Sequence, residues 1–143
     1  LGKVPVELKK SVPGHIANRI QAVVWQEALH LAQEGVASIL DIDRAIANGP
    51  GIRWSIYGPS QLFSLAAGDR GLEGFIKHLG PSFQDWWSSA GRVELNSKII
   101  DMIRNQFSQD DQDLDAMKMY RDELLVKILE AKNAIENRKI SDG

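Results

Sequence analysis

Two polar side chains near the start of the chain have the chemistry to bind a ligand. Asn18 lies on a predicted helix beside an apolar row, so it is either a satisfied core amide or a group that can hydrogen-bond a ligand. Arg53 follows the glycines at positions 49 and 51, and its guanidinium can fork onto a carboxylate or phosphate. It can equally pair with Glu27 or another acid, and the pattern alone leaves both alternatives open for each residue.

A third polar side chain, Glu27, lies in the middle of an apolar row on the same predicted helix. Steps of three and four residues place Glu27 with Ile16, Ile20, Val23, Val24 and Leu31, and place Asn18 with Ala22, Trp25 and Leu29. A carboxylate buried alone on such a row would cost on the order of several kcal/mol. We therefore expect Glu27 to be paired or hydrogen-bonded.

The helix that must position Asn18 is predicted to run from about Ile16 to Glu34. Pro13-Gly14 suits its start, because neither residue loses a hydrogen bond within the helix at that position and glycine allows a sharp turn. Gly35 suits its end, where helices commonly adopt a left-handed residue.

A second, shorter helix is predicted to follow. Ser38 with Asp41 three residues later makes an imperfect capping box before an apolar repeat. Gly49-Pro50-Gly51 is expected to end this helix in an exposed bend, which would leave Arg53 in a loop. The bend is not a dinucleotide-binding fingerprint, because Trp54 stands where the third glycine is required and a helix rather than a strand precedes it.

The middle of the chain predicts short helices separated by glycine and proline. Trp86 and Trp87 on the last of them are expected to be core residues or interface anchors rather than part of a cofactor site. The expected boundaries are a start at Pro59, a turn between Gly68 and Gly71, a break at Gly80-Pro81 and a stop at Gly91.

Two helices are predicted for the tail, from about Val93 to Phe107 and from about Asp111 to Arg138. The second would be roughly 40 Å long at about 1.5 Å per residue, which is more than so small a domain can cover. We therefore expect it to need a partner surface on a preceding domain or a second copy of the chain. The acidic run from Asp110 to Asp115 suits a solvated helix start better than a metal site. The apolar seam of this helix is Leu114, Met117, Tyr120, Leu124, Ile128, Ala131 and Ile135.

Composition excludes several classes of function. The 143 residues fit one domain, with 43% hydrophobic and 25% charged residues, which is ordinary for a globular protein. A net charge of −2 and scattered basic residues argue against a nucleic-acid partner, and the absence of cysteine excludes disulfides and thiolate metal sites. No apolar run approaches the length of ~20 residues that spans a membrane. We expect a cytoplasmic protein without a membrane partner or a metal ion.

The first half of the chain contains a specific ordered string of residues. Its members are Pro13-Gly14-His15-Ile16-Ala17-Asn18-Arg19, Glu27-Ala28, Gly35, Ala37-Ser38, Asp41-Ile42-Asp43, Ala45, Gly49, Gly51 and Gly58-Pro59. This string resembles the opening of the C-terminal domain of the 3-hydroxyacyl-CoA dehydrogenase family, clearly from about Gly2 to Trp87 and as a helix pattern beyond. Arg53-Trp54 and the later tryptophans resemble the branch that contains carnitine dehydrogenase, gulonate dehydrogenase and lambda-crystallin.

The resemblance implies a fold and a place in a longer protein. It implies an all-α, multi-helix domain like the C-terminal domain of 6-phosphogluconate dehydrogenase, with a long C-terminal helix. Residues 13–143 would form this substrate-side and dimerisation domain, and residues 1–12 would be the last strand of a Rossmann domain and a connector. That preceding domain would bind NAD and hold a histidine base, oriented by a glutamate and helped by a serine. No cofactor-binding or metal-binding residue is assigned to this chain.

The resemblance also implies roles for the two polar side chains. Asn18 would act at the catalytic centre, where its amide hydrogen-bonds the reacting oxygen or steadies the histidine, and Arg53 would bind an anionic group of the substrate. The implied reaction is hydride transfer to NAD from the secondary alcohol of a small 3-hydroxy acid or acyl-CoA, in a homodimer. The fragment alone would be inactive. The alternative is a stand-alone helical dimerisation or interaction module that shares the fold.

The sequence departs from the family pattern at two positions. His15 stands where phenylalanine is common, which predicts different packing at the start of the domain. Asn18 keeps the amide of the hydroxyacyl-CoA and gulonate enzymes, whereas carnitine dehydrogenases tend to carry an acid there. This second difference argues against carnitine as the substrate.

Overall fold

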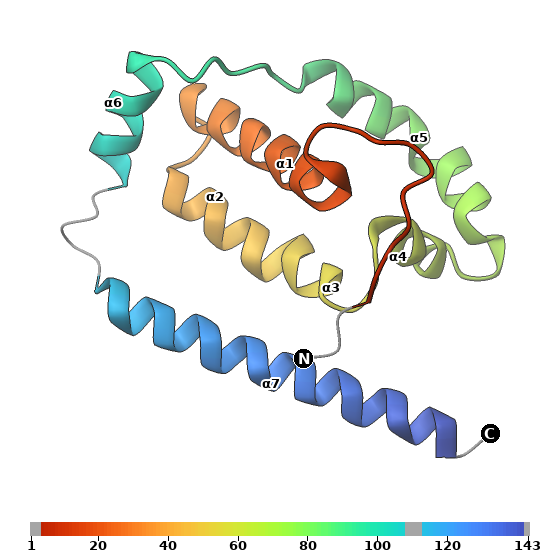
Figure 1. Ribbon diagram of the computed structural model, residues 1–143. Helices are drawn as coiled ribbons and strands as arrows, with labels where there is room; N and C mark the ends of the chain where they lie inside the picture. Colours follow the sequence, from red (N-terminus) through yellow and green to blue (C-terminus); the bar gives the residue numbers. More distant parts are fainter. Residues whose placement is uncertain (1–3, 108–112, 142–143) are drawn as a thin grey trace.

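The chain folds into helices joined by short connections in the computed structural model, which describes residues 4–107 and 113–141. No strand occurs within these two ranges, so the all-α expectation is confirmed. α1 and α2 lie side by side, α5 and α6 border them, and α7 extends along the opposite side (Figure 1). The elements are α1 (His15–Gln33), α2 (Ile39–Ile46), a π-helical turn η1 (Ala47–Gly51), α3 (Ile52–Trp54), α4 (Pro59–Ala66), a 3-10 turn η2 (Gly68–Arg70), α5 (Gly71–Ser89), α6 (Ser97–Gln106) and α7 (Leu114–Ser141).

Both ends of α1 are set by residues with a left-handed backbone. Gly14 has φ of 75° and His15 of 52°, so the chain turns sharply into the helix at the expected position. Gly35 has φ of 70° just after the helix, and the Val36 N–H donates to the Leu31 carbonyl at 3.0 Å. This six-residue closure satisfies a carbonyl that the helix leaves open, and it confirms the predicted end.

The predicted capping box at the start of α2 is confirmed. Ser38 Oγ accepts a hydrogen bond from the Asp41 backbone N–H at 3.1 Å and donates to the Asp41 carboxylate at 2.7 Å. The Asp41 carboxylate also accepts from Arg44 at 2.9 Å. The hydroxyl of Ser38 and then the guanidinium of Arg44 stabilise the charged form, which lowers the pKa of Asp41 below its usual value.

The predicted bend at Gly49-Pro50-Gly51 is wrong, because the helix continues through it. α2 passes into the π-helical turn η1 and then into α3, so Arg53 lies on a helix and not in a loop. Proline lacks the N–H that would bond four residues back, and a wider π-turn moves the bonding register to five residues. The Ile46 carbonyl then lies so close to Gly51 that a Cβ there would be 2.8 Å from its oxygen.

The predicted break at Gly80-Pro81 is also wrong, because α5 runs through it as one helix. A glycine before proline removes the Cβ that would clash with the ring, which eases a helical conformation. Phe75 before the proline and Phe83 after it both pack on Phe63 of α4. The ring centroid of Phe63 lies 4.4 Å from that of Phe75 and 5.4 Å from that of Phe83. Packing on both sides of the proline therefore supports a continuous helix.

The buried core is small and lies where α1, α2 and α6 meet. Ala28 and Ala32 of α1 pack with Ile42 of α2, and Leu29 and Ile99 are also buried. These are the only buried apolar side chains in the part of the chain that the structure describes. A chain of this length ordinarily has a larger core, so much apolar surface is left for a partner.

The first of the two helices in the tail starts later than predicted. α6 starts at Ser97 rather than near Val93, because the Asn96 side chain accepts hydrogen bonds from the backbone N–H groups of Lys98 at 3.1 Å and Ile99 at 3.3 Å. The predicted start of the second helix at Asp111 and part of the acidic run fall on residues 108–112, which lie outside the described ranges. The same holds for residues 1–3 of the expected N-terminal strand.

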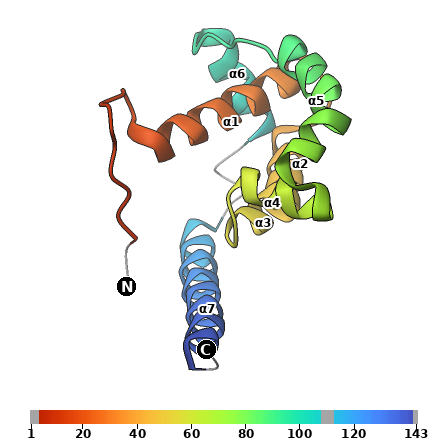
Figure 2. The ribbon, with the colours of Figure 1, turned by 90° about the vertical axis from the view of Figure 1, so that its right-hand side faces the viewer.

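α7 extends away from α1, α5 and α6 and meets the rest of the molecule near α3 (Figures 1 and 2). Lys132 Nζ of α7 donates to the Ser55 carbonyl at 2.7 Å, beside apolar hollows that contain Ile128 and Leu129. Other members of the predicted seam are exposed, with Tyr120 at 70% and Ile135 at 53%. Because these apolar side chains are exposed, α7 offers a long surface for a partner.

No helix within residues 4–107 and 113–141 is both long enough and apolar enough to cross a membrane.

The π-helical turn predicts opposite effects for two glycines that are two residues apart. Gly51→Ala should lower the free energy of unfolding by about 1–3 kcal/mol, because its Cβ meets the backbone oxygen of Ile46. Gly49→Ala should leave stability unchanged or raise it by up to about 1 kcal/mol, since a Cβ there meets nothing within 4 Å. Urea unfolding of the two variants measures both effects. Equal changes in the two variants would show that the turn is not held as described.

Candidate functional site

The main candidate site is a cleft between α1 and the facing helices α2 and α3, which we call the α1–α2 cleft. Its walls are almost entirely apolar, and Gln21 and Asp43 are its polar members. It holds two tryptophans, one from each wall. The lining residues are Ile20, Gln21, Ala22, Val24, Trp25 and Ala28 on α1, with Asp43, Ile46 and Trp54 opposite.

Asn18 lies on the first turn of α1, just beyond the end of this cleft. It shares a helix row with Ala22 and Trp25, which line the cleft, but it is not itself a lining residue. A Cβ at Gly14 would lie 3.6 Å from Asn18 Cβ, which is an ordinary van der Waals distance. Asn18 is exposed and has no hydrogen bond to another described residue. The core-amide alternative is therefore wrong in this structure.

Arg53 lies on α3, is exposed, and forms no ion pair with any described residue. The predicted alternative of an ion pair with Glu27 is contradicted, because the Glu27 carboxylate instead accepts the Gly91 backbone N–H at 3.3 Å. The next residue, Trp54, lines the cleft, whereas Arg53 itself does not. Asn18 and Arg53 are not in contact; the cleft lies between the segments that carry them.

The position of α1 depends on a close contact with Gly91. Gln26 Nε2 donates to the Gly91 carbonyl at 3.1 Å, and Glu27 accepts from its N–H, so two side chains of α1 satisfy one peptide segment. The His30 ring lies so near that a Cβ at Gly91 would be 2.2 Å from it. The expectation that Glu27 is hydrogen-bonded is thus confirmed, through a partner 64 residues away.

Sequence reasoning missed the position of Asp43. The sequence shows it only as part of the string Asp41-Ile42-Asp43, yet it lines the cleft and has no hydrogen bond or ion pair to another described residue. The available signal was its spacing, since Asp43 lies two positions beyond the capping residue Asp41 and so points to another side of the helix.

This arrangement can bind and orient a ligand. Within the described ranges, no group of three or more metal-ligating side chains could hold a metal ion. An amide, a guanidinium and an apolar cleft are suited to positioning, which is a large part of catalysis when the reacting group comes from another domain.

Comparison with known proteins identifies the family. Residues 14–103 match the family model described as 3-hydroxyacyl-CoA dehydrogenase, C-terminal domain. The match includes Asn18, Arg53 and the whole α1–α2 cleft, so the site described above lies within the matched region.

Similar curated proteins are L-carnitine dehydrogenases. The chain is 39% identical over 145 residues to the one from Pseudomonas putida, covering 100% of this chain and 44% of that protein. It is 40% identical over 102 residues to the one from Streptomyces coelicolor, covering 71% and 32%, and 36% identical over 140 residues to the one from Burkholderia mallei, covering 96% and 44%. The chain thus spans less than half the length of these relatives.

The close approach of the His30 ring to Gly91 predicts that a side chain at position 91 lowers stability. Gly91→Ala should lower the free energy of unfolding by about 1–3 kcal/mol, because its Cβ collides with the His30 ring. His30→Ala in the same chain should recover most of that loss, with a coupling energy of about 1 kcal/mol or more. Thermal unfolding of the two single variants and the double variant measures the coupling. Strictly additive effects would contradict the contact.

Proposed function

This chain belongs to the family of 3-hydroxyacyl-CoA dehydrogenase C-terminal domains, and on that premise we propose that it is the substrate-side domain of an NAD-dependent dehydrogenase. The reaction is oxidation of the secondary alcohol of a 3-hydroxy acid, or of its CoA ester, by hydride transfer to NAD. The observation that carries the proposal is that Asn18 lies on the first turn of α1, two residues before the first residue that lines the cleft, and that both fall inside the matched region. The names of the curated relatives support a dehydrogenase and make carnitine, itself a 3-hydroxy acid, one candidate within this class.

NAD is assigned to a preceding Rossmann domain rather than to this chain. The glycine-rich sequence Gly49-Pro50-Gly51 is helical here, so it offers no open loop of backbone N–H groups for a pyrophosphate. The base that takes the alcohol proton belongs to the same preceding domain. The isolated chain should accordingly bind no NAD and have no activity.

Asn18 is the catalytic residue that this domain contributes. Its exposed amide, which has no other partner in the described part of the chain, can donate a hydrogen bond to the oxygen of the reacting alcohol. As the hydride leaves the carbon and the proton leaves the oxygen, the developing carbonyl oxygen gains from a fixed donor.

Arg53 binds the anionic end of the substrate. Its exposed guanidinium has no acid to neutralise it among the described residues, and it adjoins Trp54, which lines the cleft. A carboxylate of a hydroxy acid can take both N–H groups of such a fork, which orients the alcohol toward Asn18.

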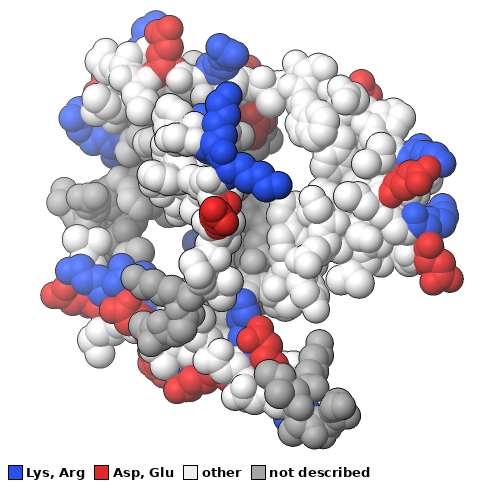
Figure 3. Space-filling view, turned by 45° about the vertical axis from the view of Figure 1, so that its right-hand side comes forward, with Lys and Arg blue, Asp and Glu red and all other residues white. Residues whose placement is uncertain are grey.

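A helical dimerisation module is the second candidate function. It is favoured by the small core and by apolar side chains that the chain exposes on α5 and α7, Trp87 and Tyr120 among them. A wide area of the face in Figure 3 also carries no Lys, Arg, Asp or Glu side chain. The two candidates are compatible, since we propose that the dehydrogenase is a homodimer built on these helices.

The catalytic role of Asn18 predicts a kinetic effect in the full-length dehydrogenase. Asn18→Ala should lower kcat/KM about a hundredfold, because it removes a donor that strengthens in the transition state. The melting temperature should change little, since the side chain is exposed. Steady-state assays with 3-hydroxy acids as substrates, beside thermal unfolding, measure both quantities. A stable variant with unchanged kcat/KM would refute the assignment.

Arg53→Ala provides the contrast, because a residue that only binds substrate acts differently. It should raise KM roughly ten- to hundredfold through the loss of a charged hydrogen bond, while kcat stays close to that of the parent. The effect should be larger for substrates whose anionic group lies near the alcohol. An equal loss for charged and uncharged substrates would contradict the clamp.

The exposed face of α7 predicts self-association of the 143-residue chain. Sedimentation should show a dimer at micromolar concentration, and Tyr120→Glu should shift it toward the monomer by placing a charge on the apolar face. Glu130→Gln, on the polar side of the same helix, is the matched control and should leave the dimer intact. A monomer at high micromolar concentration would reject the dimer.

A further inference from the structure

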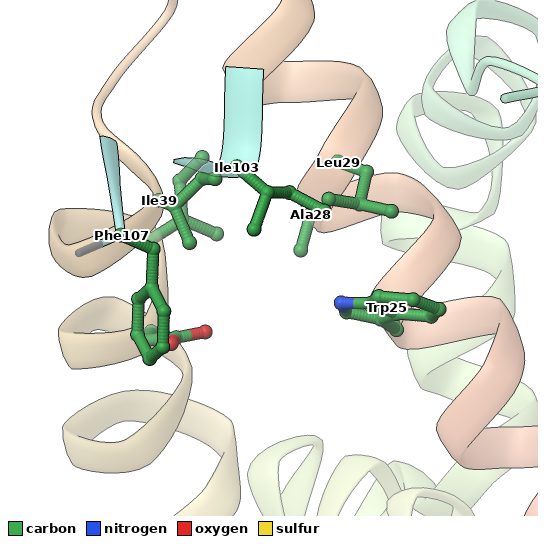
Figure 4. Close-up of a pocket in the computed structure, with 8 residues that line it drawn as sticks. Trp25, Ala28, Leu29, Ile39, Ile103 and Phe107 are labelled. Carbon is green, nitrogen blue, oxygen red and sulfur yellow. The ribbon is translucent and has the colours of Figure 1, made fainter. Parts of the chain in front are cut away.

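The helical segment that carries Arg53 is held at both ends by the tail of the chain. This segment runs through α2, η1 and α3 without a break. At its start, the Gln106 side chain of α6 accepts the Ile39 N–H at 3.2 Å. This bond lies beside a pocket of about 190 Å³, which has the rings of Trp25 and Phe107 on opposite sides (Figure 4). An N–H group that the first helical turn leaves open is thus satisfied by a side chain 67 residues away.

The far end of the segment is a turn that begins at the carbonyl of Arg53. The Ile56 and Tyr57 N–H groups both donate to the Arg53 carbonyl, at 3.0 Å and 3.1 Å. The Ser55 carbonyl lies within this turn and accepts a hydrogen bond from Lys132 Nζ of α7 at 2.7 Å. The turn is therefore closed by local N–H groups and held from outside by one lysine.

The surroundings of Lys132 strengthen this hydrogen bond. The side chain is half-buried, and it borders two hollows of about 360 Å³ and 480 Å³ between α7 and the residues around Ser55. A charged donor in a partly water-excluded position makes a stronger bond than an exposed one. A cation at the C-terminal end of a helix also interacts favourably with the helix dipole. Lys132 is thus a cap for α3 that α7 supplies.

A change in this turn reaches Arg53 directly, because Ser55 is only two residues further along and the carbonyl of Arg53 belongs to the turn. We propose that Lys132 is a positioning residue of the substrate site, which fixes the direction of Arg53 by binding the Ser55 carbonyl. An arginine on a fixed backbone loses less conformational freedom when it binds a carboxylate. The inference rests on the proposed role of Arg53 as the group that binds the anionic end of the substrate.

Hydrogen exchange tests the cap without any substrate. Lys132→Met keeps most of the length of the side chain and removes the ammonium. In the full-length protein it should raise the exchange rates of the Ile56 and Tyr57 N–H groups at least about threefold, because the turn opens more often. Lys118→Met is the matched control, since Lys118 pairs with Asp115 within α7 at 2.9 Å, and it should leave these rates unchanged. Unchanged exchange in Lys132→Met would refute the cap.

Steady-state kinetics with anionic 3-hydroxy acids tests the positioning of Arg53. Lys132→Met should raise KM about three- to tenfold and leave kcat close to that of the parent. Lys132→Arg, which can donate to the same carbonyl, should keep KM within about twofold of the parent. A merely structural role would lower the melting temperature without this selective rise in KM. In the Arg53→Ala background, Lys132→Met should raise KM no further, because the two residues act through one contact.

The outcomes separate this inference from the proposed function. If KM rises in Arg53→Ala but not in Lys132→Met, the positioning role is overturned and the substrate clamp stands. A rise of the same size with and without Arg53 would also overturn it, because Lys132 would then act by another route. If Arg53→Ala itself leaves KM unchanged, the clamp fails and the positioning role fails with it, while the exchange rates still decide whether Lys132 caps α3.

Discussion

The close packing of Gly91 against α1 is the contact on which the arrangement of the site depends. Two α1 side chains, Gln26 and Glu27, satisfy the peptide groups of Gly91, and His30 fills the space that a side chain there would need. The connection between α5 and α6 is thereby fixed to α1. At the other end of α6, Gln106 accepts the Ile39 N–H at 3.2 Å, which ties α6 to the start of α2. α1, α2 and α6 are thus held together by polar bonds as well as by their small core.

The small core explains why this chain is suited to work within a larger assembly. Alanines at positions 28 and 32 let α1 and α2 approach closely, but they contribute little apolar area each. The larger apolar residues, such as Trp86, Trp87 and Tyr120, are exposed instead. A chain that exposes such large aromatic side chains is suited to burying them against another domain or subunit.

Local signals in the sequence predicted the parts of the fold that local bonds determine. The end of α1 at Gly35 and the start of α2 at Ser38 follow from backbone and side-chain bonds within six residues, and both predictions were confirmed. The breaks expected at Pro50 and Pro81 were wrong, because a π-turn and the packing of Phe75 and Phe83 on Phe63 support the helix across them. These depend on geometry that proline alone does not reveal.

The residues of the candidate site could be predicted from the sequence only in part. Asn18 was proposed from the sequence because it belongs to a recognisable ordered string, and Arg53 because it follows the glycines at positions 49 and 51; both roles stay predictions. The partner of Glu27, at Gly91, is 64 residues distant, and the pocket that joins Trp25 to Phe107 spans an even longer separation. No periodicity connects residues so far apart, so these contacts became visible only in the folded chain.

Two opposite charges, Asp43 and Arg53, lie far apart on the segment that faces α1. Asp43 and Arg53 lie ten residues apart on the helical segment α2–η1–α3, which is roughly 15 Å at about 1.5 Å per residue. This exceeds the Debye length of about 8 Å at physiological salt, so the two exposed charges scarcely influence each other. An anion at Arg53 therefore escapes repulsion by Asp43. The neutral amide of Asn18 adds no charge of its own, so it does not disturb this balance.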